Sequence, residues 1–172
     1  MERKEQGLPY TNFVTLRGAA VTIDEPNFEE VHGLKPFMIA PTAIIRGVGK
    51  TFGMDLLDDV EGMTGYYDSN LDGKATRAAR EIIENQNGYD FGFVHVKAVD
   101  DAGHDKEPDI KVAQLEKTDR AIRKLVDMIG SHIAESEENL EVILCVTGDH
   151  TTPVKYGDHT YEPVPVAFGK VS

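Results

Sequence analysis

Apolar and polar positions repeat along the chain with two different periods. Three segments have the apolar pattern of β-strands: 12–20 (NFVTLRGAA), 90–99 (DFGFVHVKAV) and 140–146. Two further segments, 75–85 and 109–133, have a helical period, and the longer one keeps its apolar residues on one face. Pro108 marks a helix start and Gly130 a possible stop. The alternation of strands and helices predicts an α/β fold.

Strand 90–99, helix 109–133 and strand 140–146 form a predicted βαβ unit. A crossover helix of this length joins parallel strands, so we expect two parallel strands with a right-handed connection. Both strands then end at the same edge of the sheet. Ligands of open α/β sheets bind at the carboxyl ends of the strands, so this edge is the predicted functional site.

Acidic and histidine side chains gather after these strands. They are Asp100, Asp101, His104, Asp149 and His150, followed in a Pro- and Gly-punctuated loop by Asp158 and His159. Capping or a solvated loop would explain one such pair, but not the position of every cluster just after a strand. Mixed carboxylate and imidazole ligands suit borderline divalent ions such as Mn²⁺ or Zn²⁺. The sequence therefore predicts a metal site and leaves the metal open.

Composition narrows the class of protein. The 172 residues are 40% hydrophobic, which is enough for a core, and the net charge of −12 argues against a broad nucleic-acid surface. Apolar runs stay below the roughly 20 residues of a membrane span, and residues 1–12 lack a signal-peptide core, so we expect a cytoplasmic protein without a membrane partner. The single cysteine, Cys145, excludes an internal disulfide and a thiolate site; its apolar neighbours predict a buried thiol.

Three ordered motifs resemble a known family. Asp100-x-x-x-His104, Thr147-Gly-Asp149-His150 and Asp158-His159-Thr-x-x-Pro-Val-Pro are similar to the metal-binding core of the alkaline phosphatase superfamily. The stretches LRGAA, GMTGYYDSNLDGKA and FVHVKAVDDAGHD resemble the archaeal type of 2,3-bisphosphoglycerate-independent phosphoglycerate mutase over nearly the whole chain. This resemblance implies an alkaline-phosphatase-like sheet with flanking helices and two divalent ions, Mn²⁺ or Zn²⁺, with Mg²⁺ or Co²⁺ as alternatives. It assigns Asp100, His104 and His159 to one ion, and Asp149 with His150 to part of the second site.

The resemblance also implies an activity for the intact parent. A phosphoryl group passes from 3-phosphoglycerate to a serine and returns to the other hydroxyl, which is an isomerase step of glycolysis and gluconeogenesis. The family places that serine upstream of an inserted cap domain, and its motif is not found here. We therefore expect a fragment, with residues 1–58 as the end of the cap and 59–172 as the metal-binding half of the catalytic domain. The fragment alone is expected to be inactive, its parent to bind a small phosphorylated substrate, and a homo-oligomer is left open.

Two other functions fit the same motifs. The metal core is shared across the superfamily, so a related phosphohydrolase or phosphotransferase stays open, as does a non-catalytic metal-binding remnant. Guanidinium and ammonium groups suit phosphate and carboxylate, which makes four cations candidate substrate ligands, with surface or packing roles as the alternative. These cations are Arg17, Arg46, Lys50 and Lys97.

Three other features receive no functional assignment. GVGKT (47–51) evokes a phosphate loop, but the full pattern needs glycine at the position of Ile44, and the segment has helical spacing. Asp72 in LDGKA imitates the Asp-Gly start of the family, yet it precedes a helix and is expected to cap it. His132 lies within a predicted helix and is expected to be a surface or core residue.

Overall fold

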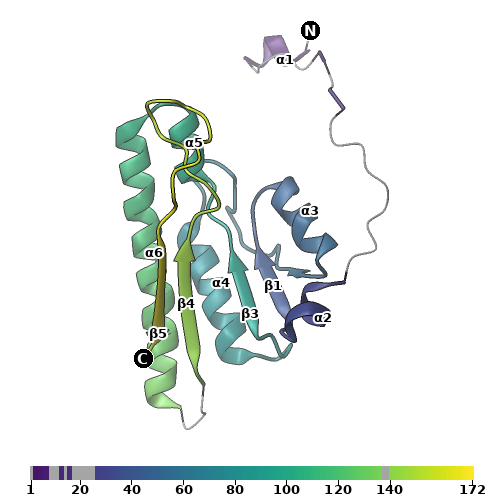
Figure 1. Ribbon diagram of the computed structural model, residues 1–172, viewed down its shortest axis with the longest axis vertical. Coiled ribbons are helices and arrows are strands. Elements are labelled where there is room, and N and C mark those ends of the chain that lie inside the picture. The colour runs from purple at the N-terminus through teal and green to yellow at the C-terminus, as the bar shows by residue number, and fades with distance from the viewer. Residues whose placement is uncertain (1, 8–11, 14, 17–25, 137–139) are drawn as a thin grey trace.

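The computed structural model describes residues 2–7, 12, 13, 15, 16, 26–136 and 140–172. Its helices are α1 (Glu2–Glu5), α2 (Phe28–His32), α3 (Ala43–Thr51), α4 (Leu71–Glu84), α5 (Ala98–His104) and α6 (Pro108–Glu135). Its strands are β1 (Pro36–Ile39), β2 (Asp55–Leu56), β3 (Phe91–Val94), β4 (Val142–Thr147) and β5 (Val166–Val171). Strands with helices packed against them confirm the predicted α/β class (Figure 1). None of the described helices combines the length and apolarity needed to span a membrane.

The strands form two hydrogen-bonded groups. One is a parallel sheet in the order β2-β1-β3, and the other is an antiparallel pair of β4 and β5. β3 and β4 point the same way, as the predicted βαβ unit requires (Figure 1), but β3 pairs with β1 and β4 with β5 among the described residues. The apolar period of a strand reports which face is buried and not which neighbour it bonds, so the sequence predicted the direction without the pairing.

Two long helices, α4 and α6, pack together behind the strands. α4 begins at the cap Asn70, whose side chain accepts a hydrogen bond from the Gly73 amide, and α6 begins with a proline. Small side chains such as Ala79 lie in one core cluster with Ile129 of α6 and Val171 of β5. The predicted helices 75–85 and 109–133 are confirmed: α4 begins earlier, at Leu71, and ends at Glu84, whereas α6 extends beyond its predicted range at both ends.

Helix α4 corrects one prediction about Asp72. The side chain that caps the helix belongs to Asn70, because its Oδ1 reaches the Gly73 amide at 2.8 Å. Asp72 lies in the first turn, 3.9 Å from the Lys124 ammonium group, where a negative charge favours the helix dipole. An acidic residue just before a helix and one in its first turn look alike in the sequence, so the prediction could not tell these two positions apart.

The predicted strand boundaries fit unevenly. Strand 140–146 corresponds to β4, whereas β3 ends at Val94, and the chain then forms α5 where 90–99 was expected to remain extended. Most of the predicted strand 12–20 lies outside the described residues, and its described positions 12, 13, 15 and 16 carry no strand. The short β3 matters for the site, because it lets a helix present the first acidic cluster.

The GVGKT segment lies inside α3, as its helical spacing predicted, and forms no phosphate loop. Gly49 is the buried position of this helix. A Cβ built at Gly49 would lie 2.6 Å from Sδ of Met38 on β1, closer than real Cβ contacts come. The glycine therefore lets α3 approach the Met38 side chain of β1 closely.

Cys145 is exposed, which contradicts the predicted buried thiol. Along β4 the side chains alternate: Val142 and Leu144 pack toward α6, whereas Ile143 is 59% exposed. Cys145 shares the outward face with Ile143, since side chains two positions apart lie on the same side of a strand. The continuous apolar run suggested a strand covered on both faces, but the described residues cover only one.

The expected division at residue 58 falls between β2 and α4. β1 and β2 lie before this position and form one parallel sheet with β3 after it. The sheet therefore joins the two segments, and the assignment of residues 1–58 to the end of a cap domain stays a prediction.

Candidate metal centre

One side of the site is built by the short helix α5. Asp100 and His104 lie one turn apart on it, so both side chains leave the same face. The buried residues Ala98 and Ala102 hold the opposite face against the protein. Because the two residues are four positions apart on the helix, their side chains are in contact, with His104 Nε2 3.4 Å from Asp100 Oδ1.

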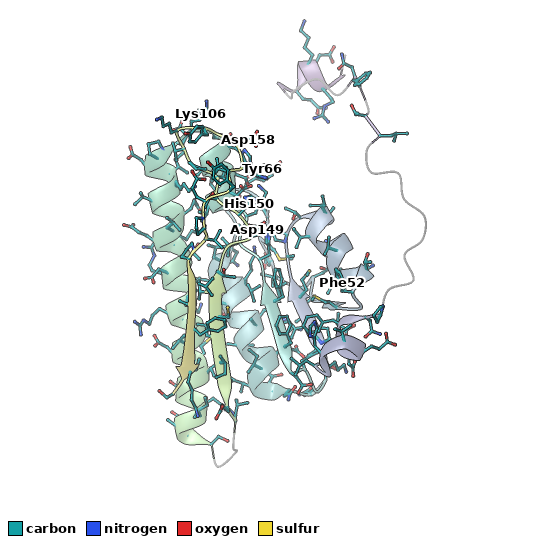
Figure 2. The ribbon with its side chains drawn as sticks, in the orientation of Figure 1. Phe52, Tyr66, Lys106, Asp149, His150 and Asp158 are labelled. Carbon is teal, nitrogen blue, oxygen red and sulfur yellow. The ribbon has the colours of Figure 1, made fainter. Side chains whose placement is uncertain are left out.

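The other side is the connection between β4 and β5. Its two arms are joined by an antiparallel bridge in which the Thr160 amide donates to the Thr151 carbonyl at 3.0 Å. The rings of His150 and His159 lie against each other beside this bridge, with centroids 3.6 Å apart and an angle of 31° between their planes. Figure 2 shows Asp149, His150 and Asp158 gathered at the same end of the molecule, so the predicted convergence of the three motifs is present.

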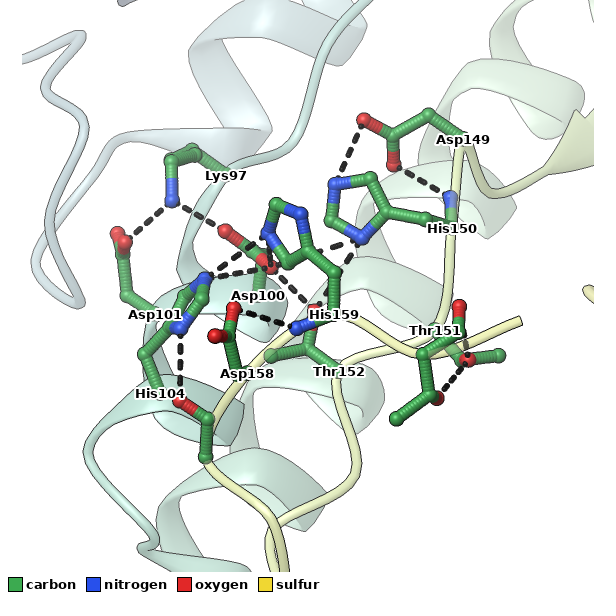
Figure 3. Close-up of polar contacts among 12 residues, drawn as sticks. Lys97, Asp100, Asp101, His104, Asp149, His150, Thr151, Thr152, Asp158 and His159 are labelled. Atoms are coloured by element: carbon green, nitrogen blue, oxygen red, sulfur yellow. Dashed lines mark hydrogen bonds and ion pairs between the residues drawn. The ribbon is translucent and has the colours of Figure 1, made fainter. Parts of the chain in front are cut away.

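Asp100, His104 and His159 form the tightest part of this cluster (Figure 3). Asp100 Oδ1 lies 3.4 Å from His104 Nε2 and 3.7 Å from His159 Nε2, and the two Nε2 atoms lie 3.1 Å apart. Ligands at the usual Zn–N distances in a tetrahedral site are separated by about 3.3 Å. The three atoms are therefore spaced as ligands of one small divalent ion.

Two other groups of three ligands also converge. The potential ligand atoms of Asp100, His150 and His159 lie within 4.8 Å of one another, and so do those of His104, Asp158 and His159. His159 belongs to both groups and to the tight triangle with Asp100 and His104. The cluster consequently has more nitrogen and oxygen donors than one ion needs, and His159 is its shared member.

His104 is held in the tautomer that metal binding requires. Its Nδ1 lies 3.0 Å from the Gly157 carbonyl oxygen. A carbonyl oxygen only accepts hydrogen bonds, so the Nδ1 atom of His104 carries the proton. With the proton on Nδ1, the lone pair of Nε2 points into the cluster. Hydrogen bonding of the second ring nitrogen to a carbonyl is a common feature of metal-bound histidine, so this geometry fits the predicted ligand.

Asp100 is kept ionised by its neighbours. Burial alone would raise the pKa of its carboxyl group, but hydrogen bonds from Lys97 and Thr152 outweigh burial and hold that pKa below its usual value. Lys97 donates to Asp100 at 2.5 Å and also to Asp101. Burial would lower the pKa of Lys97, and the two carboxylates raise it overall. The site thus presents a charged carboxylate beside histidines, which favours a cation.

Other predicted residues lie at the margin of the cluster or away from it. Asp149 is exposed at the rim, with Oδ2 3.3 Å from His150 Nε2, and Asp101 contacts Lys97. Arg46 pairs with Asp58, and Lys50 lies on the last turn of α3. Arg17 falls outside the described residues. Lys97 is therefore the one predicted substrate cation, within the described chain, whose ammonium group contacts the cluster.

Sequence reasoning missed Thr152 and undervalued Asp158. Thr152 is 4% exposed and its hydroxyl donates to Asp100 Oδ1 at 2.5 Å. Asp158 was not among the ligands that the resemblance assigned, but its carboxylate belongs to one of the three-ligand groups. Position beside the Asp-His pairs was the available signal for both residues, but it does not reveal which neighbour points inward.

Comparisons with known proteins show which family the chain resembles. The family model described as the metalloenzyme superfamily matches residues 5–172. A 2,3-bisphosphoglycerate-independent phosphoglycerate mutase of Archaeoglobus fulgidus is 40% identical over 97% of the chain, and that of Saccharolobus solfataricus is 41% identical over 95%. The chain spans only 38% and 36% of these two relatives.

A solved structure gives the same result for the fold. The PH0037 protein from Pyrococcus horikoshii superimposes with a TM-score of 0.76 and 32% identity, over 97% of this chain and 41% of that protein. The resemblance to archaeal cofactor-independent mutases that the sequence motifs predict is confirmed by these relatives. From the match over residues 5–172, the chain belongs to the metalloenzyme superfamily.

Proposed function

We propose that the intact protein to which this chain corresponds is a metal-dependent phosphoglycerate mutase that interconverts 3- and 2-phosphoglycerate. The observation that carries the proposal is the triangle of Asp100, His104 and His159, in a chain whose relatives are named as such mutases. A phosphoserine intermediate, formed on a residue outside this chain, is part of the proposal. Glycolysis and gluconeogenesis would be its metabolic setting.

For the ions we propose the division that the motifs implied. Asp100, His104 and His159 would hold one ion, because their donor atoms are the closest to one another. Asp149 and His150 would contribute to a second, with further ligands from the rest of the parent. Mn²⁺ and Zn²⁺ suit this mixture of imidazole and carboxylate best, with Mg²⁺ and Co²⁺ as alternatives.

The charges of substrate and site explain why such a centre is needed. A phosphate monoester carries two negative charges and would be repelled by Asp100 and its acidic neighbours. Divalent ions, when bound here, neutralise phosphoryl oxygens and stabilise the leaving oxygen. The chain's own residues contribute position: His104 presents Nε2 because Gly157 fixes its tautomer, and three protein ligands leave room for a substrate oxygen.

Lys97 is proposed as a substrate contact. Its ammonium group lies between Asp100 and Asp101 at the edge of the cluster. A cation bound by Asp100 would weaken the hold of that carboxylate on Lys97 by charge competition. The ammonium group would then be free to approach a phosphate or carboxylate oxygen, which suits a compact positive charge.

A coupled enolase assay on the intact parent tests the proposal. With Mn²⁺ and 3-phosphoglycerate but no added bisphosphoglycerate, we expect 2-phosphoglycerate to form. The 172-residue chain alone should give no measurable turnover, because the proposed phosphoserine forms elsewhere. Hydrolysis of phosphate esters by the parent without 2-phosphoglycerate would replace the mutase by a related phosphohydrolase. A parent that binds metal but transforms neither kind of substrate would favour the non-catalytic reading.

A further inference from the structure

Thr152 stands between the two sides of the metal centre. It lies on the connection between β4 and β5, two residues after His150, and its side chain is almost fully buried at 4% exposure. Its hydroxyl donates to Asp100 Oδ1 at 2.5 Å and lies 3.3 Å from His150 Nδ1. One hydroxyl therefore contacts candidate ligands from both the helix side and the loop side.

The hydroxyl binds the same oxygen that faces the histidines. Asp100 Oδ1 is the atom closest to His104 Nε2 and His159 Nε2. A carboxylate oxygen accepts in more than one direction, so a bond from Thr152 leaves a lone pair for a cation. The other oxygen, Oδ2, is occupied by Lys97. With both oxygens engaged, the carboxylate is restrained from rotating about its own axis.

The backbone of Thr152 is fixed independently of its hydroxyl. The Lys111 ammonium group on α6 donates to the Thr152 carbonyl at 2.6 Å. Gly103 on α5 lies so close that an added Cβ would come within 2.2 Å of that carbonyl oxygen. Glycine at this position thus allows the loop to pack closely against α5. Because the backbone of Thr152 is held in place, its side chain is directed toward Asp100.

We propose that Thr152 is a positioning residue that orients Asp100 for metal binding through its hydroxyl group. The inference rests on the proposed metal centre and adds a residue to it. Groups that hydrogen-bond a metal ligand orient it, and their loss typically weakens metal affinity by about 10- to 100-fold. A purely structural threonine would act through its methyl group and volume instead, so the two roles can be separated by substitution.

The test compares Thr152→Ser with Thr152→Ala in the full 172-residue chain. These variants lack the same methyl group and differ from each other only in the hydroxyl. Each chain is stripped of metal, checked for its fold by circular dichroism, and titrated with Mn²⁺ by calorimetry. We expect Thr152→Ser to bind Mn²⁺ close to the original affinity and Thr152→Ala to bind about 10-fold or more weakly.

Each other outcome counts against the proposal. Equal affinities of the Ser and Ala variants, whether high or low, would overturn the role of the hydroxyl. If Thr152→Ala does not fold, Thr152→Val keeps the side-chain volume and must still bind more weakly than Thr152→Ser. Unfolding of both hydroxyl-free variants would show a structural role only. Failure of the original chain to bind Mn²⁺ would overturn the metal centre as well, whereas a parent without mutase activity would leave the Thr152 result standing.

Discussion

The helix side and the loop side of the metal centre are built in different ways. On the helix side, Asp100 and His104 project from α5, whose other face is buried, and the Asp100 side chain is only 21% exposed. On the loop side, the His159 side chain is 50% exposed and Asp149 reaches 70%. The loop is held mainly by the Thr151–Thr160 bridge and by contacts of Thr152. Both sides contribute donors of the same kind, but only one has them fixed by a helix.

This difference suggests how the centre works. Ligands on a packed helix keep their geometry without a cation, whereas those on an exposed connection gain it from a few hydrogen bonds. We therefore expect the helix side to act as the template for the ion and the loop side to complete the set of donors. Substitutions on the two sides test this division, because the template should carry more of the affinity than any single residue of the loop.

The largest effect is expected for Asp100→Ala. Asp100 Oδ1 lies within 4.0 Å of a nitrogen of each of three histidines, so its removal takes the negative charge from the middle of the cluster. We expect Mn²⁺ affinity to fall by about 100-fold or more, at the upper end of losses seen around metal sites. Calorimetric titration of the metal-free chain measures the change.

Asp101→Ala provides the matched control. Asp101 is the adjacent acid on the same helix, is also partly exposed and also pairs with Lys97, but it lies in none of the three-ligand groups. Its loss should leave Mn²⁺ affinity nearly unchanged. If both substitutions weaken binding equally, the general negative charge of α5 attracts the ion, and Asp100 is not a specific ligand.

The second prediction concerns the stability contributed by a buried lysine near the helix side of the metal centre. Lys74 of α4 is 1% exposed, and its ammonium group donates to the His95 carbonyl at 2.9 Å, between β3 and α5. Burial, together with the nearby Lys117 charge, lowers the pKa of Lys74 from 10.5 to about 8. Between these pH values the unfolded chain binds more protons than the folded one, so stability should rise with pH.

When the pH rises from 7 to 10, we expect the free energy of unfolding of the original chain to increase by roughly 2 kcal/mol more than that of the Lys74→Met variant. Below pH 8 both states hold the Lys74 proton, so the difference between the two chains should be flat there. Urea unfolding at several pH values, without metal, measures both chains. A constant difference from pH 7 to 10 would mean that the folded protein does not disfavour the charged lysine, and that its pKa is close to ordinary.

Parts of this architecture could be predicted from local sequence, and others could not. The helices α4 and α6 and the strand β4 were predicted because their apolar side chains recur three or four positions apart in the helices and two apart in the strand. The convergence of Asp100 and His104 with Asp149 and His150 was also predicted, from the rule that parallel strands end at one edge. The grouping of Asp100, His104 and His159 came from the resemblance of the motifs to a known family. Motif order supplied the remainder of that prediction.

The missed features all depend on contacts between distant segments. Thr152 and Asp100 are 52 positions apart, and nothing in the two residues shows that a hydroxyl meets a carboxylate. Cys145 was predicted to be buried because apolar composition reports a tendency to be covered, while exposure depends on what packs above the strand. The pairing of β3 with β1 was not predicted either. Strands pair through backbone hydrogen bonds, which are not visible in the pattern of side chains.

The smallest effects are expected for single histidines, and they compare the two sides directly. His104→Ala removes a ligand from the helix side and His159→Ala one from the loop side. Each should weaken Mn²⁺ binding by about 10-fold, because neighbouring donors such as His150 and Asp158 can partly replace it. His132→Ala, on the last turn of α6 and in none of the three-ligand groups, serves as the control and should not change the affinity.

The pH dependence of the same titrations sharpens the comparison. Metal binding needs neutral imidazole and releases protons, so the Mn²⁺ affinity of the original chain should fall as the pH is lowered. Removing either ligand histidine should make this fall less steep, since one fewer proton competes with the ion. If His159→Ala has no effect while His104→Ala does, His159 is not a ligand of the first site, and the tight triangle must be replaced by a set from α5 and His150. Equal affinities of all three variants would place the ion elsewhere.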